Sequence, residues 1–351
     1  MNHNSNRIKL YSNVSKNLAR LNQEKLKQIL ADAKPMHAGI GGQSCLSYID
    51  ETPVFIKKVP LTDLEQAPQN FLSTANLFNL PLSYQYGIGS TGFGAWRELA
   101  THILTSNWVI TGECPNFPIL YHWCIFQQDP TELNLEEWGD IDAYCQYWEH
   151  SRPIRKRVEC LNKASSHIAL FLEYIPQNLY EWLSIEISKG SGTAELAIAS
   201  VDAHLKATST YMNRNGLIHF DAHFKNILTD GRQLYFSDFG LALSSKFDIS
   251  TTEAEFLKRH QNYDTSYASL NLLLSIFGAV FKKDPWDVRL REHIAYEPDA
   301  LSPAIASIIK RHMPIGLIMD EFLEKLRKEN KSTPYPDISL KKLLTLSSET
   351  T

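Results

Sequence analysis

Residues 216–243, GLIHFDAHFKNILTDGRQLYFSDFGLAL, constrain the fold more than any other part of this 351-residue chain. Three side chains with metal-binding oxygens have fixed places in it: Asp221 and Asn226 in an early loop, and Asp238 after an apolar strand. A Thr-Asp-Gly turn at 229–231 separates two apolar runs, which is typical of a β-hairpin. Such a hairpin brings Asn226 and Asp238 to one end of its strands, with Asp221 beside them.

Carboxylate and amide oxygens grouped in this way suit phosphoryl transfer from a nucleotide. That reaction needs oxygen ligands that hold Mg²⁺ on the phosphates, and one further carboxylate that positions the acceptor hydroxyl. The motif His219-x-Asp221-x-x-x-x-Asn226, followed by Asp238-Phe239-Gly240, resembles the catalytic loop and the metal-binding motif of the protein-kinase-like superfamily. The resemblance implies that Asp221 orients the acceptor and that His219 braces the loop. It also implies that Asn226 and Asp238 hold Mg²⁺.

Residues upstream match the phosphate-binding strand of that family. Val54-Phe55-Ile56-Lys57 resembles the V-A-I-K strand, which implies that Lys57 binds the α and β phosphates of ATP. Strand alternation lets only one of two neighbouring lysines face the nucleotide, and Lys58 is the competing choice. The acidic partner of Lys57 is expected on a following helix. Glu98 is our choice, which requires an insertion between strand and helix, and Glu65 is the alternative.

Two further segments resemble nucleotide-binding elements of the family. The Gly-rich stretch one hairpin ahead of Lys57 would let backbone N–H groups approach the phosphates without interference from Cβ atoms. Its candidate residues are Gly39, Gly41, Gly42 and Ser44, with Ser44 in place of a third glycine. Leu172-Glu173-Tyr174-Ile175 resembles the linker between lobes, which implies that main-chain groups of Glu173 and Ile175 bond adenine.

The resemblance covers roughly residues 36–280 and implies an α+β, two-lobed protein-kinase-like fold with ATP and Mg²⁺ bound between the lobes. The small β-rich N-lobe is expected over 36–175, with insertions at about 61–94 and 127–167. A mainly helical C-lobe with the catalytic loop is expected over 176–351, and a leading helix within 1–35.

Hydrophobic spacing makes three local expectations that the structure can test. An apolar stripe over 14–30 predicts one amphipathic helix that Pro35 ends. A second helix over 96–110 is expected to carry Leu99, Ile103 and Leu104 on one side. The basic run at 152–157, RPIRKR, is interpreted as a solvated loop.

Departures from the family pattern bear on the substrate. Phe220 replaces the arginine of many regulated kinases, and no A-P-E motif follows Gly240; a capped helix is expected soon after instead. The intact motifs favour a protein Ser/Thr kinase. His223, in a place where aminoglycoside phosphotransferases often carry histidine, favours the alternative of a small-molecule kinase. A pseudokinase that only binds is the second alternative, and the complete set of Lys57, Asp221, Asn226 and Asp238 opposes it.

Composition narrows the setting of this activity. The formal net charge of −4 supplies no field that would attract nucleic acid, and five cysteines without a CxxC pair suggest neither a disulfide framework nor a zinc ribbon. A reducing cytoplasm fits best, and no apolar run has the length of a membrane span. The partners that the resemblance implies are ATP and an unidentified protein or small-molecule acceptor.

Overall fold

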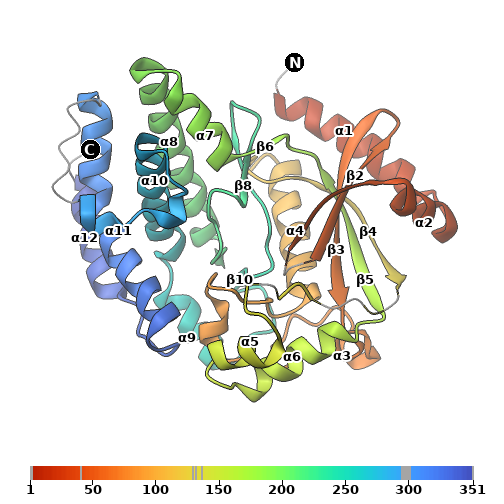
Figure 1. Ribbon diagram of the computed structural model, residues 1–351. Coiled ribbons are helices and arrows are strands. Elements are labelled where there is room, and N and C mark those ends of the chain that lie inside the picture. Colours follow the sequence, from red (N-terminus) through yellow and green to blue (C-terminus); the bar gives the residue numbers. More distant parts are fainter. Residues whose placement is uncertain are drawn as a thin grey trace. The chain divides into compact units, whose positions relative to one another are not determined.

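The computed structural model describes residues 3–39, 42–128, 130, 133–135, 137–293 and 302–349 (Figure 1). The chain forms two compact units. Unit 1 consists of Met1–Tyr174 and Asp238–Ser250, and unit 2 consists of Ile175–Ser237 and Thr251–Thr351. Helices and a five-stranded antiparallel sheet together make a mixed α+β structure, which confirms the predicted α+β class.

The sheet of unit 1 has the strand order β1-β2-β3-β5-β4. Its strands are β1 Lys34–Gly39, β2 Gly42–Ile49, β3 Thr52–Leu61, β4 Leu120–Gln127 and β5 Ser166–Glu173. The predicted hairpin between β2 and β3 is present, with Ile49 opposite Thr52. Its two turn residues, Asp50 and Glu51, both have positive φ, as the tight turns that match strand twist require. β3 and β5, at the centre of the sheet, are the most deeply buried strands.

The remaining elements of unit 1 are two long helices, α1 and α4, several shorter ones, two 3₁₀ turns and a short strand. They are α1 His3–Ala19, α2 Gln23–Asp32, α3 Asp63–Gln66, α4 Ala95–Ile110, α5 Ile141–Tyr147 and α6 Arg152–Asn162, the 3₁₀ turns Pro68–Asn70 and Leu82–Gln85, and the short strand β10 Leu243–Ser244. The single leading helix predicted from the sequence is wrong: α1 ends, and α2 starts afresh where the Asn22 side chain accepts a hydrogen bond from Lys25 N. Pro35 lies in the edge strand β1, where its missing N–H is tolerated.

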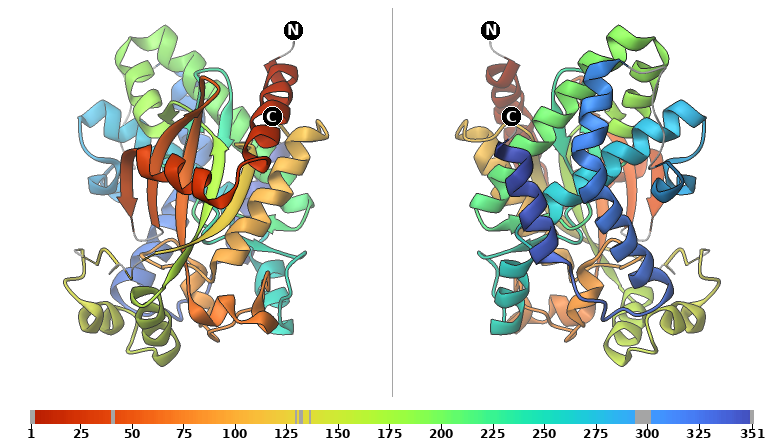
Figure 2. Two further views of the ribbon diagram at one scale, coloured as in Figure 1. Left: turned by 90° about the vertical axis from the view of Figure 1, so that its right-hand side faces the viewer. Right: turned by 90° about the vertical axis from the view of Figure 1, so that its left-hand side faces the viewer.

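Helix α4 packs on one face of the sheet, and α2 lies in front of the strands in the left view of Figure 2. Trp96 and Leu99 of α4 join the core formed with β3, β4 and β5. The predicted stripe is wrong beyond Leu99, because Ile103 is 41% exposed. Thr101 and Thr105 are buried instead, since each hydroxyl donates to a carbonyl one turn earlier in the helix.

The basic run RPIRKR forms the first turns of helix α6. Its interpretation as a solvated loop is wrong at Arg157, whose side chain is 3% exposed and forms an ion pair with Glu65. The Arg157 guanidinium also lies 5.0 Å from the centre of the Phe78 ring. Arg152 and Lys156 are exposed as expected. Helical periodicity separates these neighbours, because one face of α6 is buried and the other is not.

Unit 2 is mainly helical. Its elements are α7 Leu179–Ser188, α8 Ser191–Arg214, α9 Thr251–Arg259, α10 Tyr263–Phe281, α11 Pro303–Lys328 and α12 Asp337–Glu349, the 3₁₀ turns Pro285–Asp287 and Leu290–His293, and the strands β6 Gln177–Asn178, β7 Leu217–Ile218, β8 Ile227–Thr229 and β9 Leu234–Phe236. The apolar helix α10 is buried along most of its length. The predicted hairpin at the Thr-Asp-Gly turn is present as β8 and β9, and the helix predicted after Gly240 is α9.

Candidate functional site

Lys57 is held by two carboxylates inside unit 1. It lies on β3, on the side of the sheet that Phe55, Val59 and α4 share. Its Nζ is 2.6 Å from Oε1 of Glu98, on the first turn of α4, and 2.8 Å from Oδ1 of Asp238. The structure thus pairs Lys57 with Glu98, the choice made from the sequence. The alternative partner, Glu65, is engaged elsewhere.

Burial and the neighbouring charges have opposite effects on the pKa of Lys57. Burial alone would lower the pKa of Lys57, but the charges of Asp238 and Glu98 and their hydrogen bonds raise this pKa above its ordinary range. Lys57 is therefore a permanent cation at any physiological pH. The side chains of Lys57 and Glu98 are 11% and 4% exposed, whereas that of Asp238 is 43% exposed. Only the Asp238 carboxylate is thus open to solvent or to a ligand.

Asp238 owes its position to the residue that follows it. Phe239 is fully buried, and its ring lies 4.9 Å from that of His102 on α4 and 6.3 Å from that of Phe117. Asp238 itself has a φ of 61°, a conformation that non-glycine residues adopt rarely. A buried aromatic anchor directly after a strained aspartate fixes the direction in which its carboxylate leaves the backbone.

The Gly-rich segment connects β1 and β2, with Gly39 opposite Gly42. Gly42 has a φ of 133°, and a Cβ there would lie 2.2 Å from the carbonyl oxygen of Lys58, so only glycine fits. Ser44 lies opposite Lys57 in the register of β2 and β3. Gly41 lies outside the described residues. The Gly-rich segment therefore leads directly into the strand beside Lys57.

The side chain of Glu173, at the end of β5, is bound by an arginine that the sequence did not indicate. Arg7 of α1 donates from Nε and Nη2 to the two Glu173 carboxylate oxygens at 2.8 and 2.7 Å. The N–H of Glu173, one of the main-chain groups expected to bond adenine, donates to the carbonyl of Ile119 at 2.8 Å. Ile175, the other expected residue, begins unit 2 and is buried.

The predicted catalytic loop lies within unit 2 and is linked internally. The amide nitrogen of Asn226 donates to the carbonyl of Asp221 at 3.0 Å and to Oδ2 of Asp221 at 3.1 Å. The amide oxygen of Asn226 can act only as an acceptor. Ser237 donates through its hydroxyl to the carbonyl of Asn226 at 2.6 Å, which joins the loop to the end of β9.

His219 and Asp264 hold this loop in place through hydrogen bonds to backbone atoms. The Nε2 atom of His219 is 2.8 Å from the carbonyl oxygen of Ser237, the residue before Asp238. Oδ2 and Oδ1 of Asp264 accept from the backbone N–H groups of His219 and Phe220 at 2.7 and 3.0 Å. The role of Asp264 in holding this loop was not predicted from the sequence. Its signal is an acidic residue in the first turn of an otherwise strongly apolar helix, where a charge must have a buried partner.

Asp264 provides a pH-dependent prediction. Burial, only partly opposed by the two backbone hydrogen bonds, raises the pKa of Asp264 from 3.8 to about 6. The folded state therefore binds more protons than the unfolded state between these values, and the stability contributed by the protonated form is lost as pH rises through 6. Relative to Asp264→Asn, the wild type should gain about 2 kcal/mol in free energy of unfolding when the pH falls from 7 to 4.

Urea unfolding of both proteins at each pH measures this difference. Asp287→Asn, an exposed substitution in the same unit, is the matched control and should show no such trend. A difference between wild type and Asp264→Asn that stays constant over the range would contradict the assigned role of Asp264.

The structure brings Lys57, Glu98 and Asp238 together in unit 1, and it brings His219, Asp221 and Asn226 together in unit 2. The joint action of Asn226 and Asp238 on one metal ion stays a prediction. Among the residues that the structure describes, no group of three or more His, Cys, Asp or Glu side chains could hold a metal ion. No described helix has the length and apolar character needed to span a membrane. Comparison with protein-family models and with curated proteins finds no match to this chain.

Proposed function

We propose that this protein is an ATP-dependent phosphotransferase with a two-lobed protein-kinase-like fold, in which unit 1 binds the nucleotide phosphates and unit 2 supplies the acceptor-orienting loop. One observation carries the proposal. A buried lysine on a central strand contacts a buried glutamate on a helix and a half-exposed aspartate of the D-F-G motif. These three residues are far apart in sequence, and the contact of Lys57 with Glu98 is the one that the family resemblance leads us to expect.

The charges at Lys57 support binding of a further cation. Lys57 contacts both Glu98 and Asp238; burial raises the pKa of Glu98, and the partly exposed carboxylate of the cluster is that of Asp238. A structural ion pair would need only one of these carboxylates. The carboxylate of Asp238 and the amide oxygen of Asn226 are each hard oxygen ligands of the kind that Mg²⁺ takes. When bound, Mg²⁺ neutralises charge on the phosphates.

The chain's own residues then divide the work. The Lys57 ammonium, fixed by Glu98, binds phosphate oxygens in a site of low water content, where such contacts are strong. Asp221 accepts the proton of the acceptor hydroxyl and orients its oxygen, while Asn226 holds the Asp221 carboxylate in place by a hydrogen bond. The Gly-rich turn between β1 and β2, with Gly39 opposite Gly42, is the segment that we propose lies against the phosphates.

Backbone strain supports the assignment of these loops. Phe220 and Asp238 have φ angles of 63° and 61°, and each lies beside or within a predicted catalytic motif. Left-handed non-glycine residues of this kind cost energy and gather at sites where geometry is functional. Buried aromatic contacts at Phe220 and Phe239 maintain the strained conformations.

A protein serine or threonine hydroxyl is the acceptor that we propose first. One observation favours a second candidate, a small molecule: Nε2 of His223 lies 3.9 Å from Oδ1 of Asp221, where histidine can contact a small acceptor. Incubation with γ-labelled ATP and Mg²⁺, alone and with cell extract, separates the two when labelled protein and labelled small molecules are resolved. ATP binding without any labelled product would favour a pseudokinase instead.

Phe220, in the predicted catalytic loop, leads to a prediction about regulation by phosphorylation. Phe220 replaces the arginine that would hold a phosphate, and it packs on Tyr263 and Phe256 with ring centres 4.9 and 5.6 Å away. We expect the enzyme to be active as synthesised. Phosphatase treatment, verified by mass spectrometry, should leave ATP turnover within about threefold of the untreated protein, a difference of about 0.7 kcal/mol. A tenfold fall would show that a phosphate controls the site.

A further inference from the structure

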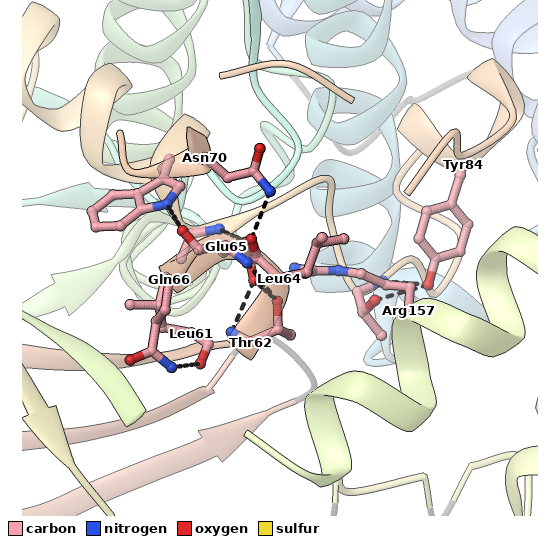
Figure 3. A network of polar contacts seen from close by, with 11 residues as sticks. Leu61, Thr62, Leu64, Glu65, Gln66, Asn70, Tyr84 and Arg157 are labelled. Carbon is pink, nitrogen blue, oxygen red and sulfur yellow. Dashed lines mark hydrogen bonds and ion pairs between the residues drawn. The ribbon is translucent and has the colours of Figure 1, made fainter. Parts of the chain in front are cut away.

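Glu65 lies where hydrogen-bond donors from three segments of unit 1 meet. Its side chain is 1% exposed. Oε2 accepts from the backbone N–H and the hydroxyl of Thr62, at 3.0 and 2.6 Å, and from Nη1 of Arg157 at 3.0 Å. Oε1 accepts from the backbone N–H of Ala95 at 2.8 Å. Figure 3 shows this network, with Glu65 at its centre between Thr62 and Arg157.

The contact with Ala95 places Glu65 at the start of helix α4. Ala95 is the first residue of α4, and its N–H has no partner inside the helix. The residue before it, Gly94, has no side chain to cap the helix, so the Glu65 carboxylate takes that role from α3 and also complements the positive end of the helix dipole.

Two further contacts tie α4 to Glu65. The indole Nε1 of Trp96 donates to the Glu65 carbonyl at 2.9 Å. A Cβ on Gly94 would lie 2.8 Å from Glu65 Oε1, so the carboxylate approaches α4 as closely as a glycine permits. The start of α4 is therefore fixed on α3 by a side-chain oxygen, a main-chain oxygen and close packing.

Glu98 belongs to the same first turn of α4, and its oxygen lies 2.6 Å from Nζ of Lys57. Any shift of the helix start moves Glu98 relative to the strand that carries Lys57. We infer that Glu65 is a positioning residue, which holds α4 in the place where Glu98 pairs with Lys57, and that Arg157 holds Glu65. The effect of Glu65 on phosphoryl transfer rests on the proposed function, whereas its effect on the pairing of Lys57 with Glu98 does not.

The segment 127–167, which the sequence analysis expects to be an insertion, has a role in this positioning. Arg157 comes from α6 in that segment, and its ion pair with Glu65 is almost completely buried. A buried ion pair is by itself weak evidence of a stabilising function. Here the second carboxylate oxygen binds the helix that carries Glu98, which links the pair to the candidate site.

Acylation of lysines by acetic anhydride, followed by mass spectrometry, tests the inference without any assumed activity. Lys58 is the internal reference, because it adjoins Lys57 and faces the other side of the sheet. Glu65→Gln should raise the acylation rate of Lys57 relative to Lys58 at least fivefold, since Lys57 loses its buried partner when α4 moves. Asp63→Asn, a substitution at the start of the same short helix, should leave the ratio unchanged.

Two more variants separate the steps of the argument. Ala95→Pro removes the N–H that Glu65 caps and puts the ring Cδ in its place, at a helix position where the φ of proline is tolerated, and it should also raise the Lys57 ratio. Arg157→Met should do the same, whereas Lys156→Met, exposed on the same helix, should not. Thermal unfolding identifies any variant that fails to fold. The Lys57 acylation ratios of the folded variants then test the positioning role of Glu65.

Unchanged Lys57 ratios in folded Glu65→Gln and Ala95→Pro proteins would overturn the inference, even if the protein transfers phosphate. If the Lys57 ratios rise but the wild type transfers no phosphate, the positioning role stands and the proposed function fails. If the positioning role and the proposed phosphotransferase activity both hold, ATP turnover at saturating ATP should fall at least tenfold in Glu65→Gln. It should stay within twofold of wild type in Asp63→Asn.

Discussion

Asp238→Asn should lower phosphoryl transfer at least 1000-fold, which corresponds to about 4 kcal/mol of transition-state stabilisation. The Asp238 carboxylate is the exposed member of the Lys57 cluster and lies 2.8 Å from Lys57 Nζ. The substitution keeps the shape of the side chain but removes the charge that would bind the metal ion on the phosphates. Rates are measured with saturating ATP and Mg²⁺.

Asp248→Asn is the matched control for this variant. Asp248 is exposed and belongs to the same segment, Asp238–Ser250, so its substitution should leave the rate unchanged. The fold should persist in Asp238→Asn, because Lys57 keeps Glu98 as a partner. Transfer within threefold of wild type in folded Asp238→Asn would remove Asp238 from the site.

Lys57→Met should have the second large effect, on both activity and stability. It removes the ammonium that would bind phosphate oxygens, so ATP turnover should fall at least 100-fold. It also leaves Glu98, which is 4% exposed, without its buried partner, and breaking such a pair costs about 3–5 kcal/mol. Urea unfolding measures the loss of stability.

Lys58→Met is the neighbouring control. Lys58 faces the other side of the sheet, and its loss should change turnover less than twofold and the free energy of unfolding by less than about 0.5 kcal/mol. The double variant Lys57→Met/Glu98→Gln should recover part of the lost stability but none of the turnover. Turnover that depends on Lys58 and not on Lys57 would contradict the assignment.

Sequence reasoning succeeded where a residue's role depends on local register. Alternation along β3 separates Lys57 from Lys58, and the Thr-Asp-Gly turn defines the β8–β9 hairpin. The pairing of Lys57 with Glu98 was also expected, because the family resemblance implies an acidic partner for the strand lysine on a following helix.

The sequence could not indicate contacts that tertiary packing alone creates. Glu65 and Arg157 are separated by 92 positions, and neither has a local pattern that marks it as buried. The same holds for Arg7 with Glu173, whose partners lie on a helix and a strand far apart in the chain. Ile103 was misassigned for a related reason: threonine hydroxyls that bond within α4 let a polar face be buried in place of an apolar one.

Transfer of the γ-phosphoryl group of ATP by the wild-type protein tests the central claim most directly. Purified protein is incubated with γ-labelled ATP and cell extract, with Mg²⁺ or with excess EDTA, and labelled products are counted against Asp221→Asn as the inactive reference. The account predicts labelled product that requires Mg²⁺ and is absent for Asp221→Asn. Product formation that Asp221→Asn sustains at the wild-type rate, or no product from a wild-type protein that binds ATP, would contradict it.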